Sequence, residues 1–387
     1  MNIVFLISSI NTEGNGGHYY SLIETVKNLQ NEHNCEVINI GTQKSKALIN
    51  QDFFNVTFFD SSNFSFFKVY RQVNLYCLHK KIDVIHSFDS LAFLWARLLS
   101  NKIKCKLVLT KCGGANLFYY PFCSNTICYS LENYKFFKNL KKFKETQLYL
   151  IPNRISEFLD DEIRIKKLND LIKKEHHNLF KFLRILRISS YYEKSLMQLI
   201  DLVQKLNSLK VRCILIIIGT IDDQRIVDNV KRMKLDYIYL INEDLFTINA
   251  KEVINYVDGV LGTGRSFMES ASKSKILLSP ISQGQFPMLI SENNFETAFE
   301  YNFSERISIF NYNDLENFNE IDTMLSDDNT RINLKKLSRS IFDEHFNSNS
   351  LIEKHNVVYS KEKIQTNKFL DLLLNYLFVL RKHFVKI

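Results

Sequence analysis

Two successive rounds of short apolar runs alternating with helical segments run through this 387-residue sequence. Segments with helical spacing, such as His18–Leu29 and Phe66–His79, separate the apolar runs of the first half. Strands that alternate with helices predict a parallel sheet covered by helices. The strand-like runs of the first half are Ile3–Ile7, Cys35–Ile40, Val56–Phe59, Val84–His86, Lys106–Thr110, Thr126–Tyr129 and Leu148–Ile151.

The alternation restarts after a polar, charge-rich stretch, Arg154–Lys181, which we interpret as the passage between two domains. A helical segment, Ser195–Leu206, follows the first strand of the second half. Each half has a plausible size for a Rossmann-like sheet. We therefore expect an α/β protein with domains at residues 1–155 and 175–345. The strand-like runs of the second half are Phe182–Ile188, Cys213–Ile218, Tyr237–Leu240, Gly259–Leu261 and Ile276–Leu278.

Composition narrows the class of protein. The hydrophobic fraction of 45% is ordinary for a globular chain and argues against disorder. The net charge of +8 permits an anionic ligand or a membrane surface and does not require nucleic acid. The seven cysteines show no CxxC or zinc-like spacing, which indicates free thiols in a reducing compartment. With no signal-peptide pattern and no long apolar run, we expect a cytoplasmic protein.

A glycine-rich turn, Glu13–His18, follows the first predicted strand and precedes the first helix. Glycines at such a turn let backbone N–H groups approach a phosphate or sugar closely, and the helix dipole favours an anion there. The turn is not a strict GxGxxG, and no acidic residue follows the second strand, which disfavours a dehydrogenase. An ordinary β–α turn remains the alternative.

A second glycine-rich segment, Gly262–Glu269, follows the apolar run Val257–Leu261 and opens a helix. Its glycines, hydroxyls and Arg265 are typical of an anion site at a helix start. A third segment holds Arg187 and Lys194, which could converge on a diphosphate, although such a pair is often only solvated surface. Gly219 ends the next strand and allows a further close backbone approach.

Taken in order, these segments resemble the GT-B glycosyltransferases of the large retaining family 4. The resemblance covers roughly Met1 to Pro280, and it depends on the order and spacing of short motifs. The matching segments are Gly16-Gly17, Asp83–His86, Leu109–Gly114, Tyr129-Ser130, Ile151–Ile155, the Arg187 and Lys194 pair, and Asp258–Glu269.

The resemblance implies two Rossmann-like domains that face a cleft, with a C-terminal helical segment, residues 346–387, crossing back to pack on the first domain. It implies a nucleotide-diphosphate sugar as donor, held mainly by the second domain, and no metal or other cofactor. Arg187 and Lys194 would hold the diphosphate and stabilise the charge on the leaving group. Glu269 would bind the ribose hydroxyls. The further donor-side residues are Gly16, Gly17, Gly219, Gly262, Thr263, Gly264, Arg265 and Ser266.

The chain departs from the family pattern at three places. Leu261 stands where the first Glu of the Glu-x7-Glu motif is expected, and Arg187 lies further from Lys194 than usual. Cys112 stands near the place of a His on the acceptor side, and a thiol cannot replace its charge at neutral pH. His18 or His86 could take that role, although each is more often structural.

The resemblance places the reaction in the synthesis of a surface glycan such as a capsule, an O-antigen or an exopolysaccharide, with a glycan or lipid-linked acceptor. The segment Tyr134–Lys144 interleaves basic and aromatic residues as an interfacial helix does, so peripheral contact with the inner face of the plasma membrane is a further option. A solvated amphipathic helix explains it equally well, and we expect no nucleic-acid partner. The alternatives in function are a non-catalytic binding relative, motivated by Leu261 and Cys112, and a sugar-nucleotide epimerase.

Overall fold

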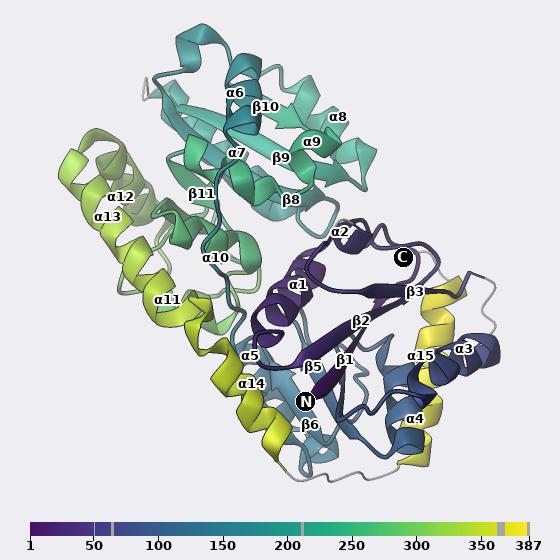
Figure 1. Cartoon of the computed structure of the whole chain (residues 1–387). Helices are drawn as coiled ribbons and strands as arrows, with labels where there is room; N and C mark the ends of the chain where they lie inside the picture. Colours follow the sequence, from purple (N-terminus) through teal and green to yellow (C-terminus); the bar gives the residue numbers. More distant parts are fainter. Residues whose placement is uncertain (50, 63–65, 210–212, 362–367, 385–387) are drawn as a thin grey trace. The chain divides into compact units, whose positions relative to one another are not determined.

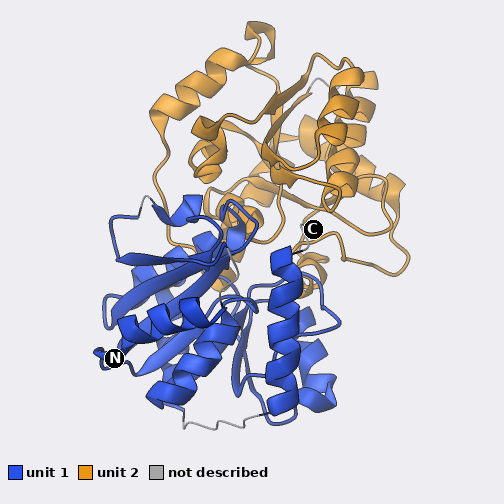
Figure 2. Cartoon of the chain, turned by 90° about the vertical axis from the view of Figure 1, so that its right-hand side faces the viewer, with its two compact units in different colours: residues 1–154, 348–387 blue, residues 155–347 orange. Residues whose placement is uncertain are grey.

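The computed structural model describes residues 1–49, 51–62, 66–209, 213–361 and 368–384. It divides into two compact units (Figure 2). Unit 1 comprises Met1–Arg154 together with Ser348–Ile387, and unit 2 comprises Ile155–Asn347. Each unit is an α/β structure built around one sheet (Figure 1).

Unit 1 contains a seven-stranded sheet in the order β3-β2-β1-β4-β5-β6-β7, and all of its neighbouring strands pair in parallel. Ile3 of β1 aligns with Cys35 of β2 on one side and with Val84 of β4 on the other. The strands are β1 (Asn2–Ser9), β2 (Asn34–Gly41), β3 (Val56–Asp60), β4 (Val84–Ser87), β5 (Lys106–Lys111), β6 (Asn125–Cys128) and β7 (Gln147–Leu150).

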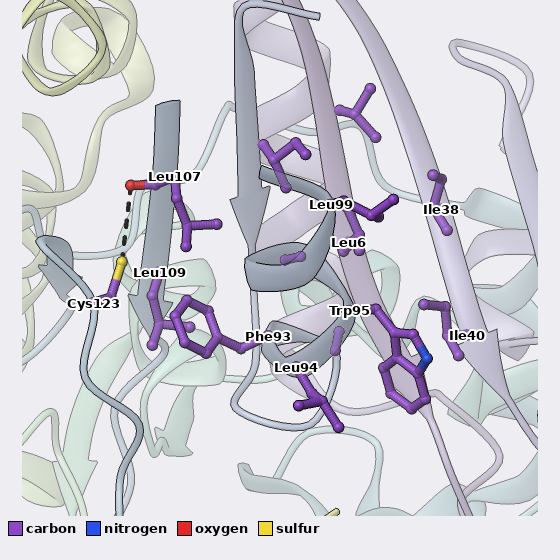
Figure 3. Close-up of a cluster of buried hydrophobic side chains, with 14 of the residues drawn as sticks. Leu6, Ile38, Ile40, Phe93, Leu94, Trp95, Leu99, Leu107, Leu109 and Cys123 are labelled. Carbon is purple, nitrogen blue, oxygen red and sulfur yellow. Dashed lines mark hydrogen bonds between the residues drawn. The ribbon is translucent and has the colours of Figure 1, made fainter. Parts of the chain in front are cut away.

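Helices cover both faces of this sheet. Successive residues of a strand point to opposite faces, so each strand contributes side chains to two cores. Leu6 of β1 belongs to the core that contains Trp95 (Figure 3), whereas Phe5 belongs to a second core with Leu22 of α1. The helices of the first segment are α1 (Gly17–Leu29), α2 (Lys46–Ile49), α3 (Phe66–Leu78), α4 (Phe93–Ile103) and α5 (Leu131–Asn139), followed by the 3₁₀ turn η1 (Lys141–Phe143).

Two helices at the end of the chain, α14 (Leu351–Ser360) and α15 (Phe369–Phe384), complete unit 1. The predicted return of the C-terminal segment to the first domain is therefore part of the observed fold. Val358 and Tyr359 of α14 are buried in the core that contains Phe5. Val379 of α15 is buried in the core that contains Trp95.

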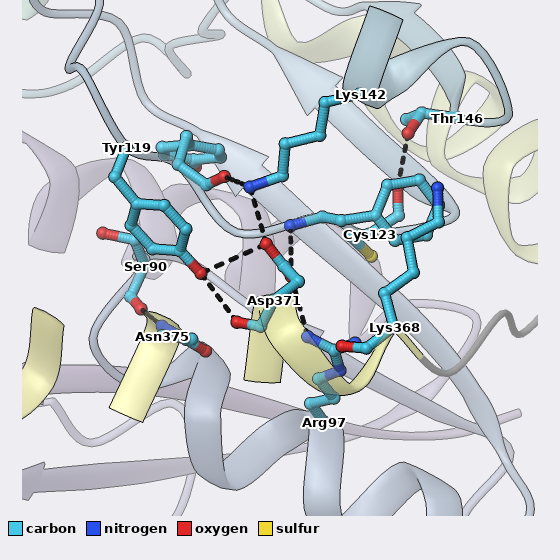
Figure 4. Close-up of polar contacts among 11 residues, drawn as sticks. Ser90, Arg97, Tyr119, Cys123, Lys142, Thr146, Lys368, Asp371 and Asn375 are labelled. Carbon is cyan, nitrogen blue, oxygen red and sulfur yellow. Dashed lines mark hydrogen bonds and ion pairs between the residues drawn. The ribbon is translucent and has the colours of Figure 1, made fainter. Parts of the chain in front are cut away.

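A buried ion pair fixes α15 to unit 1 (Figure 4). Asp371 accepts hydrogen bonds from Arg97 of α4 at 2.8 Å and from the backbone N–H of Phe122 at 2.9 Å. Lys142 lies 2.6 Å from the other carboxylate oxygen, and the Tyr119 hydroxyl donates to the Asp371 carbonyl at 2.9 Å. Because the side chains of Arg97 and Asp371 are each only 6% exposed, neither charge can be solvated if its partner is lost.

Unit 2 contains a six-stranded sheet in the order β10-β9-β8-β11-β12-β13, parallel except for β13, which pairs antiparallel to β12. Alternate residues of β9 again enter two cores, as Leu215 and Ile216 do. The strands are β8 (Phe180–Ile188), β9 (Cys213–Ile221), β10 (Ile238–Ile241), β11 (Gly259–Leu261), β12 (Ile276–Ser279) and β13 (Met288–Leu289).

The helices of unit 2 include one in the stretch that the sequence suggested as a passage between domains. The Asp161 side chain caps α6 (Glu162–Leu171), and Leu168 and Ile172 are buried in the core of unit 2. Most of that stretch is therefore part of unit 2. The other helices are α7 (Glu193–Ser208), α8 (Gln224–Arg232), α9 (Asp244–Thr247), α10 (Arg265–Ser272), α11 (Phe295–Glu300), α12 (Asp314–Ser326) and α13 (Asp328–Ile341).

The expected strands are confirmed, each to within three residues at either end. All seven cysteines are free thiols, as expected. Within the described residues, no helix combines the length and the apolar composition needed to cross a membrane.

The substitution Asp371→Asn should destabilise unit 1 by about 3 kcal/mol or more, because it leaves the Arg97 guanidinium buried without its counter-charge. Trp95 is the one tryptophan of the chain and is buried in unit 1, so its fluorescence during urea unfolding reports this loss. The control is Glu145→Ala, which removes a partly exposed ion pair to Lys368 and should cost less than about 1 kcal/mol. Equal losses in the two variants would contradict the assigned role of Asp371.

Candidate functional site

Each sheet has a topological switch point, which is the place beside its first strand where the chain connections begin to lead in opposite directions. In unit 1 this point lies between β1 and β4, and in unit 2 it lies between β8 and β11. Ligands of open α/β sheets bind outside the carboxyl ends of the strands at such points. Both predicted glycine-rich segments lie there, because Glu13–His18 follows β1 and Gly262–Glu269 follows β11.

The turn after β11 is held in one conformation by its own contacts. A Cβ at Gly262 would lie 2.4 Å from the Phe267 Cα, and Gly264 has a φ of +50°, so both positions favour glycine. The Ser266 hydroxyl accepts a hydrogen bond from the Thr263 N–H at 3.0 Å and donates to the Thr263 carbonyl at 3.1 Å. The turn therefore leads directly into the first turn of α10, where the helix dipole favours an anion.

Arg265 and Glu269, both predicted on the donor side, form an ion pair one turn apart on α10. The Arg265 Nε donates to a Glu269 carboxylate oxygen at 2.7 Å, and the two side chains are 8% and 10% exposed. The structure thus brings the predicted cation and the predicted ribose-binding carboxylate together. Arg265 also neutralises part of the charge of Glu269 and orients it.

Arg184 is a buried residue of this region that sequence reasoning missed. It lies on β8 beside Leu261 of β11, and its side chain is fully buried. Its guanidinium donates to the Leu261 carbonyl at 2.9 Å and to the Ser195 hydroxyl at 3.0 Å, and burial lowers its pKa. The sign in the sequence that could have identified Arg184 is its charge inside the otherwise mostly apolar run Phe182–Ile188.

Glu305 supplies the counter-charge to Arg184. A carboxylate oxygen of Glu305 lies 3.5 Å from an Arg184 Nη, and the Glu305 side chain is 14% exposed. Within the described residues, neither carboxylate oxygen of Glu305 has a hydrogen-bond partner. The nearby Tyr192 phenol has a raised pKa because it is buried and because Glu305 is close. A polar pair with unused hydrogen-bonding capacity therefore lies at the carboxyl end of β11.

Arg187 and Lys194 contact different loops of unit 2. The Arg187 Nε lies 3.2 Å from a carboxylate oxygen of Asp222, which follows β9, and its side chain is 55% exposed. The Lys194 ammonium group donates to the carbonyl of Ser282, which follows β12. The structure does not show the two cations converging, and their role in holding a diphosphate stays a prediction.

Gly219 has a structural reason for being glycine. A Cβ at this position would lie 2.1 Å from the Leu186 carbonyl oxygen of the neighbouring strand. The sequence suggested a close approach to the backbone at Gly219, and in the structure the neighbouring strand β8 makes that approach. The donor-side role of Gly219 remains a prediction.

In unit 1, Gly16 and Gly17 are exposed at the start of α1, and His18 beside them is half-buried. The His18 ring lies against Tyr19, with ring centroids 4.1 Å apart, and the Tyr19 hydroxyl donates to the Ser8 carbonyl at 2.5 Å. His18 is thus placed at the switch point of unit 1, next to the carboxyl end of β1.

His86 is enclosed by the protein, and Cys112 is partly buried. His86 is fully buried, and its two ring nitrogens lie 2.8 Å from the Tyr359 hydroxyl and 2.6 Å from the Thr110 hydroxyl. Both nitrogens are thus occupied by protein groups, which indicates a structural histidine. The Cys112 thiol donates to the Phe88 carbonyl at 3.4 Å, and burial raises its pKa, so it is an uncharged thiol at neutral pH.

Comparisons with known proteins define the fold. No protein-family model and no curated protein matches this chain. Among solved structures, Alr3699/HepE of Anabaena in complex with UDP and glucose is 15% identical, with a TM-score of 0.67 over 94% of this chain and 100% of that one. A glycosyltransferase of Rickettsia africae ESF-5 is 17% identical, with a TM-score of 0.66 over 92% and 97% of the two chains.

A third solved structure agrees with these two. The pneumococcal O-GlcNAc transferase GtfA in complex with UDP and GlcNAc is 10% identical, with a TM-score of 0.63 over 93% of this chain and 98% of that one. The chain therefore has the GT-B fold, as expected. At these identities the comparisons establish the fold, and membership of family 4 remains a prediction.

Two arginines of β8 provide a matched pair of variants. Arg184→Met should destabilise unit 2 by about 3 kcal/mol, because the Glu305 carboxylate would be left buried without its cation. Arg187→Met removes a largely exposed ion pair and should cost less than about 1 kcal/mol. Circular dichroism during urea unfolding measures both, with Trp95 fluorescence as a separate record of unit 1. A larger loss in Arg187→Met would contradict this assignment.

Buried histidines should make unit 1 less stable in acid. Burial lowers the pKa of His355 to about 4 and that of His86 well below 6.5, so the unfolded chain binds these protons more readily. The free energy of unfolding should fall by about 3 kcal/mol for the two residues between about pH 7.5 and about pH 5.5. Urea unfolding followed by Trp95 fluorescence measures it. His355→Asn should reduce this pH dependence and the exposed His79→Asn should not, and the opposite pattern would refute the explanation.

Proposed function

We propose that the chain is a glycosyltransferase that uses a UDP-sugar as its donor. The observation that carries the proposal is the glycine-bounded start of α10 at the switch point of unit 2, with buried Arg184 and Glu305 beside it. Two structural neighbours support UDP as the nucleotide, since HepE was solved with UDP and glucose and GtfA with UDP and GlcNAc.

In this proposal the first turn of α10 faces the donor phosphates, and Glu269 accepts hydrogen bonds from the ribose. The Arg265 side chain fixes the Glu269 carboxylate for that task, at 2.7 Å. Arg187 and Lys194 stabilise the charge that develops on the leaving diphosphate, and both are exposed side chains whose present contacts are easily exchanged for a ligand.

Leu261 takes the place of a carboxylate that the family resemblance leads one to expect. Its side chain is fully buried, while its carbonyl accepts a hydrogen bond from Arg184. The same guanidinium holds Glu305, so a carboxylate is present at this end of β11 from another part of the chain. We propose that Glu305 contributes the donor-side carboxylate that position 261 lacks.

The transfer is proposed to proceed with retention, to a glycan or lipid-linked acceptor in surface-glycan synthesis, as the family resemblance implies. In the front-face mechanism the leaving phosphate oxygen takes the acceptor proton, so no strong general base is needed. This suits a unit 1 in which His86 is enclosed and Cys112 is an uncharged thiol. A reaction without a resident metal is part of the same proposal.

The substitution Lys194→Ala should weaken UDP binding about tenfold or more, because it removes a charge-assisted hydrogen bond to the diphosphate. Isothermal titration calorimetry with UDP measures it. The matched control is Lys205→Ala, a second exposed lysine at the other end of α7, which should leave the affinity unchanged. Equal affinities in wild type and Lys194→Ala would refute the assigned donor site.

A non-catalytic sugar-nucleotide-binding relative is the second candidate, favoured by the buried leucine at position 261. It predicts the same UDP binding but no consumption of any UDP-sugar. Nuclear magnetic resonance of UDP-sugars mixed with lipid-linked acceptors separates the two, because transfer releases UDP and gives a product whose anomeric configuration can be read. Binding without release of UDP would favour the second candidate.

A further inference from the structure

The C-terminal helix α15 presents an apolar face to solvent. Six of its large hydrophobic side chains are between 41% and 81% exposed. Spacings of three, four and seven residues place most of them on one side of the helix. They are Phe369, Leu370, Leu373, Leu374, Leu377 and Phe384.

Val379 in the core and several polar contacts hold the opposite side of α15 against the protein. Asp371 is bound by Arg97 and Lys142 (Figure 4). Further along the helix, the Asn375 amide donates to the Ser90 carbonyl at 3.2 Å, and a His383 ring nitrogen lies 2.5 Å from the Ser61 carbonyl. Turning the apolar face inward would break each of these buried contacts, so the apolar face is held outward.

A second exposed apolar element lies next to the start of α15. Tyr119 donates to the Asp371 carbonyl, and its ring lies 5.7 Å from that of Phe378. The two residues before Tyr119 are Leu117 and Phe118, which are 45% and fully exposed. An aromatic side chain in open solvent beside an exposed helix face indicates a surface that meets an apolar environment.

Basic side chains gather on the α5–η1 segment, residues 131–145, whose end lies beside the start of α15. The α5–η1 segment lies beside the start of α15, because its Lys142 contacts Asp371 and because Lys368 forms an ion pair with Glu145. Its aromatic residues pack on the core that contains Trp95, Phe137 and Phe143 fully and Tyr134 and Phe136 in part, so this segment offers mainly charge to solvent. The exposed basic residues of this segment, which we call the lysine border, are Lys135, Lys138, Lys141 and Lys144, and Arg381 is exposed on α15 itself.

We propose that α15 lies in the headgroup region of an anionic lipid membrane, with its apolar face toward the acyl chains and the lysine border on the lipid phosphates. Leucine and phenylalanine faces bordered by lysine and arginine bind anionic interfaces in this way. Residues 131–145 contain two acidic residues, Glu132 and Glu145, and Glu145 is paired with Lys368. A second copy of the chain would bring two basic borders together, which opposes self-association. The proposal goes beyond the transferase function and does not depend on the donor site.

Flotation of the whole chain with vesicles tests this proposal. Vesicles of phosphatidylcholine mixed with phosphatidylglycerol should carry the protein upward, and vesicles of phosphatidylcholine alone should carry much less. The double variant Leu373→Asn with Leu377→Asn should reduce binding about tenfold or more, because each removes an apolar side chain from the interface. Lys138→Glu with Lys141→Glu should reduce binding to the anionic vesicles.

The matched control is Leu315→Asn with Ile332→Asn, two exposed apolar positions of unit 2 that should not affect flotation. Trp95 fluorescence during urea unfolding shows that each variant of unit 1 is folded. Absence of flotation, equal flotation with both vesicle types, or equal loss in the control would each overturn the proposal. So would a wild-type dimer that the leucine variant converts to a monomer, because the face would then belong to a second copy.

Discussion

The guanidinium of Arg184 is the interaction on which the architecture of unit 2 depends. It lies in the middle of β8 and binds the last carbonyl of β11, the hydroxyl of Ser195 on α7 and the carboxylate of Glu305. A fully buried cation must have such partners, because no water replaces them. These contacts fix the end of β11 relative to β8. Because the glycine turn and α10 follow directly after β11, the same contacts help to position the start of α10.

The strands could be predicted because each is a short apolar run between polar segments, and parallel strands covered on both faces must have that composition. The glycine turn before α10 could be predicted for a local reason as well, since its residues contact one another. Glu305 could not, because its role comes from Arg184, more than a hundred residues earlier in the chain. Helix α6 was hidden by its charged residues, since it buries little more than Leu168.

The orientation of α15 could not be predicted from the sequence either. Its sequence shows many leucines, and the ordinary expectation is that leucines face the core. Here Asp371, Asn375 and His383 face the protein, because Arg97 and two backbone carbonyls offer them buried partners. Those partners come from distant segments, so no local pattern contains them. These buried polar contacts, together with Val379 in the core, hold the exposed leucines on the outer side of the helix.

The division of unit 1 between the two ends of the chain has a consequence for its synthesis. Unit 2 is continuous, from Ile155 to Asn347, so all of its sequence is translated before α14 and α15 of unit 1. The two segments of unit 1 lie on either side of it, so Arg97 meets Asp371 only after α15 has been translated. Until α15 is made, the Arg97 guanidinium lacks its counter-charge, and the core that contains Trp95 lacks Val379. Unit 1 can thus reach its native form only after the whole of unit 2 has been translated.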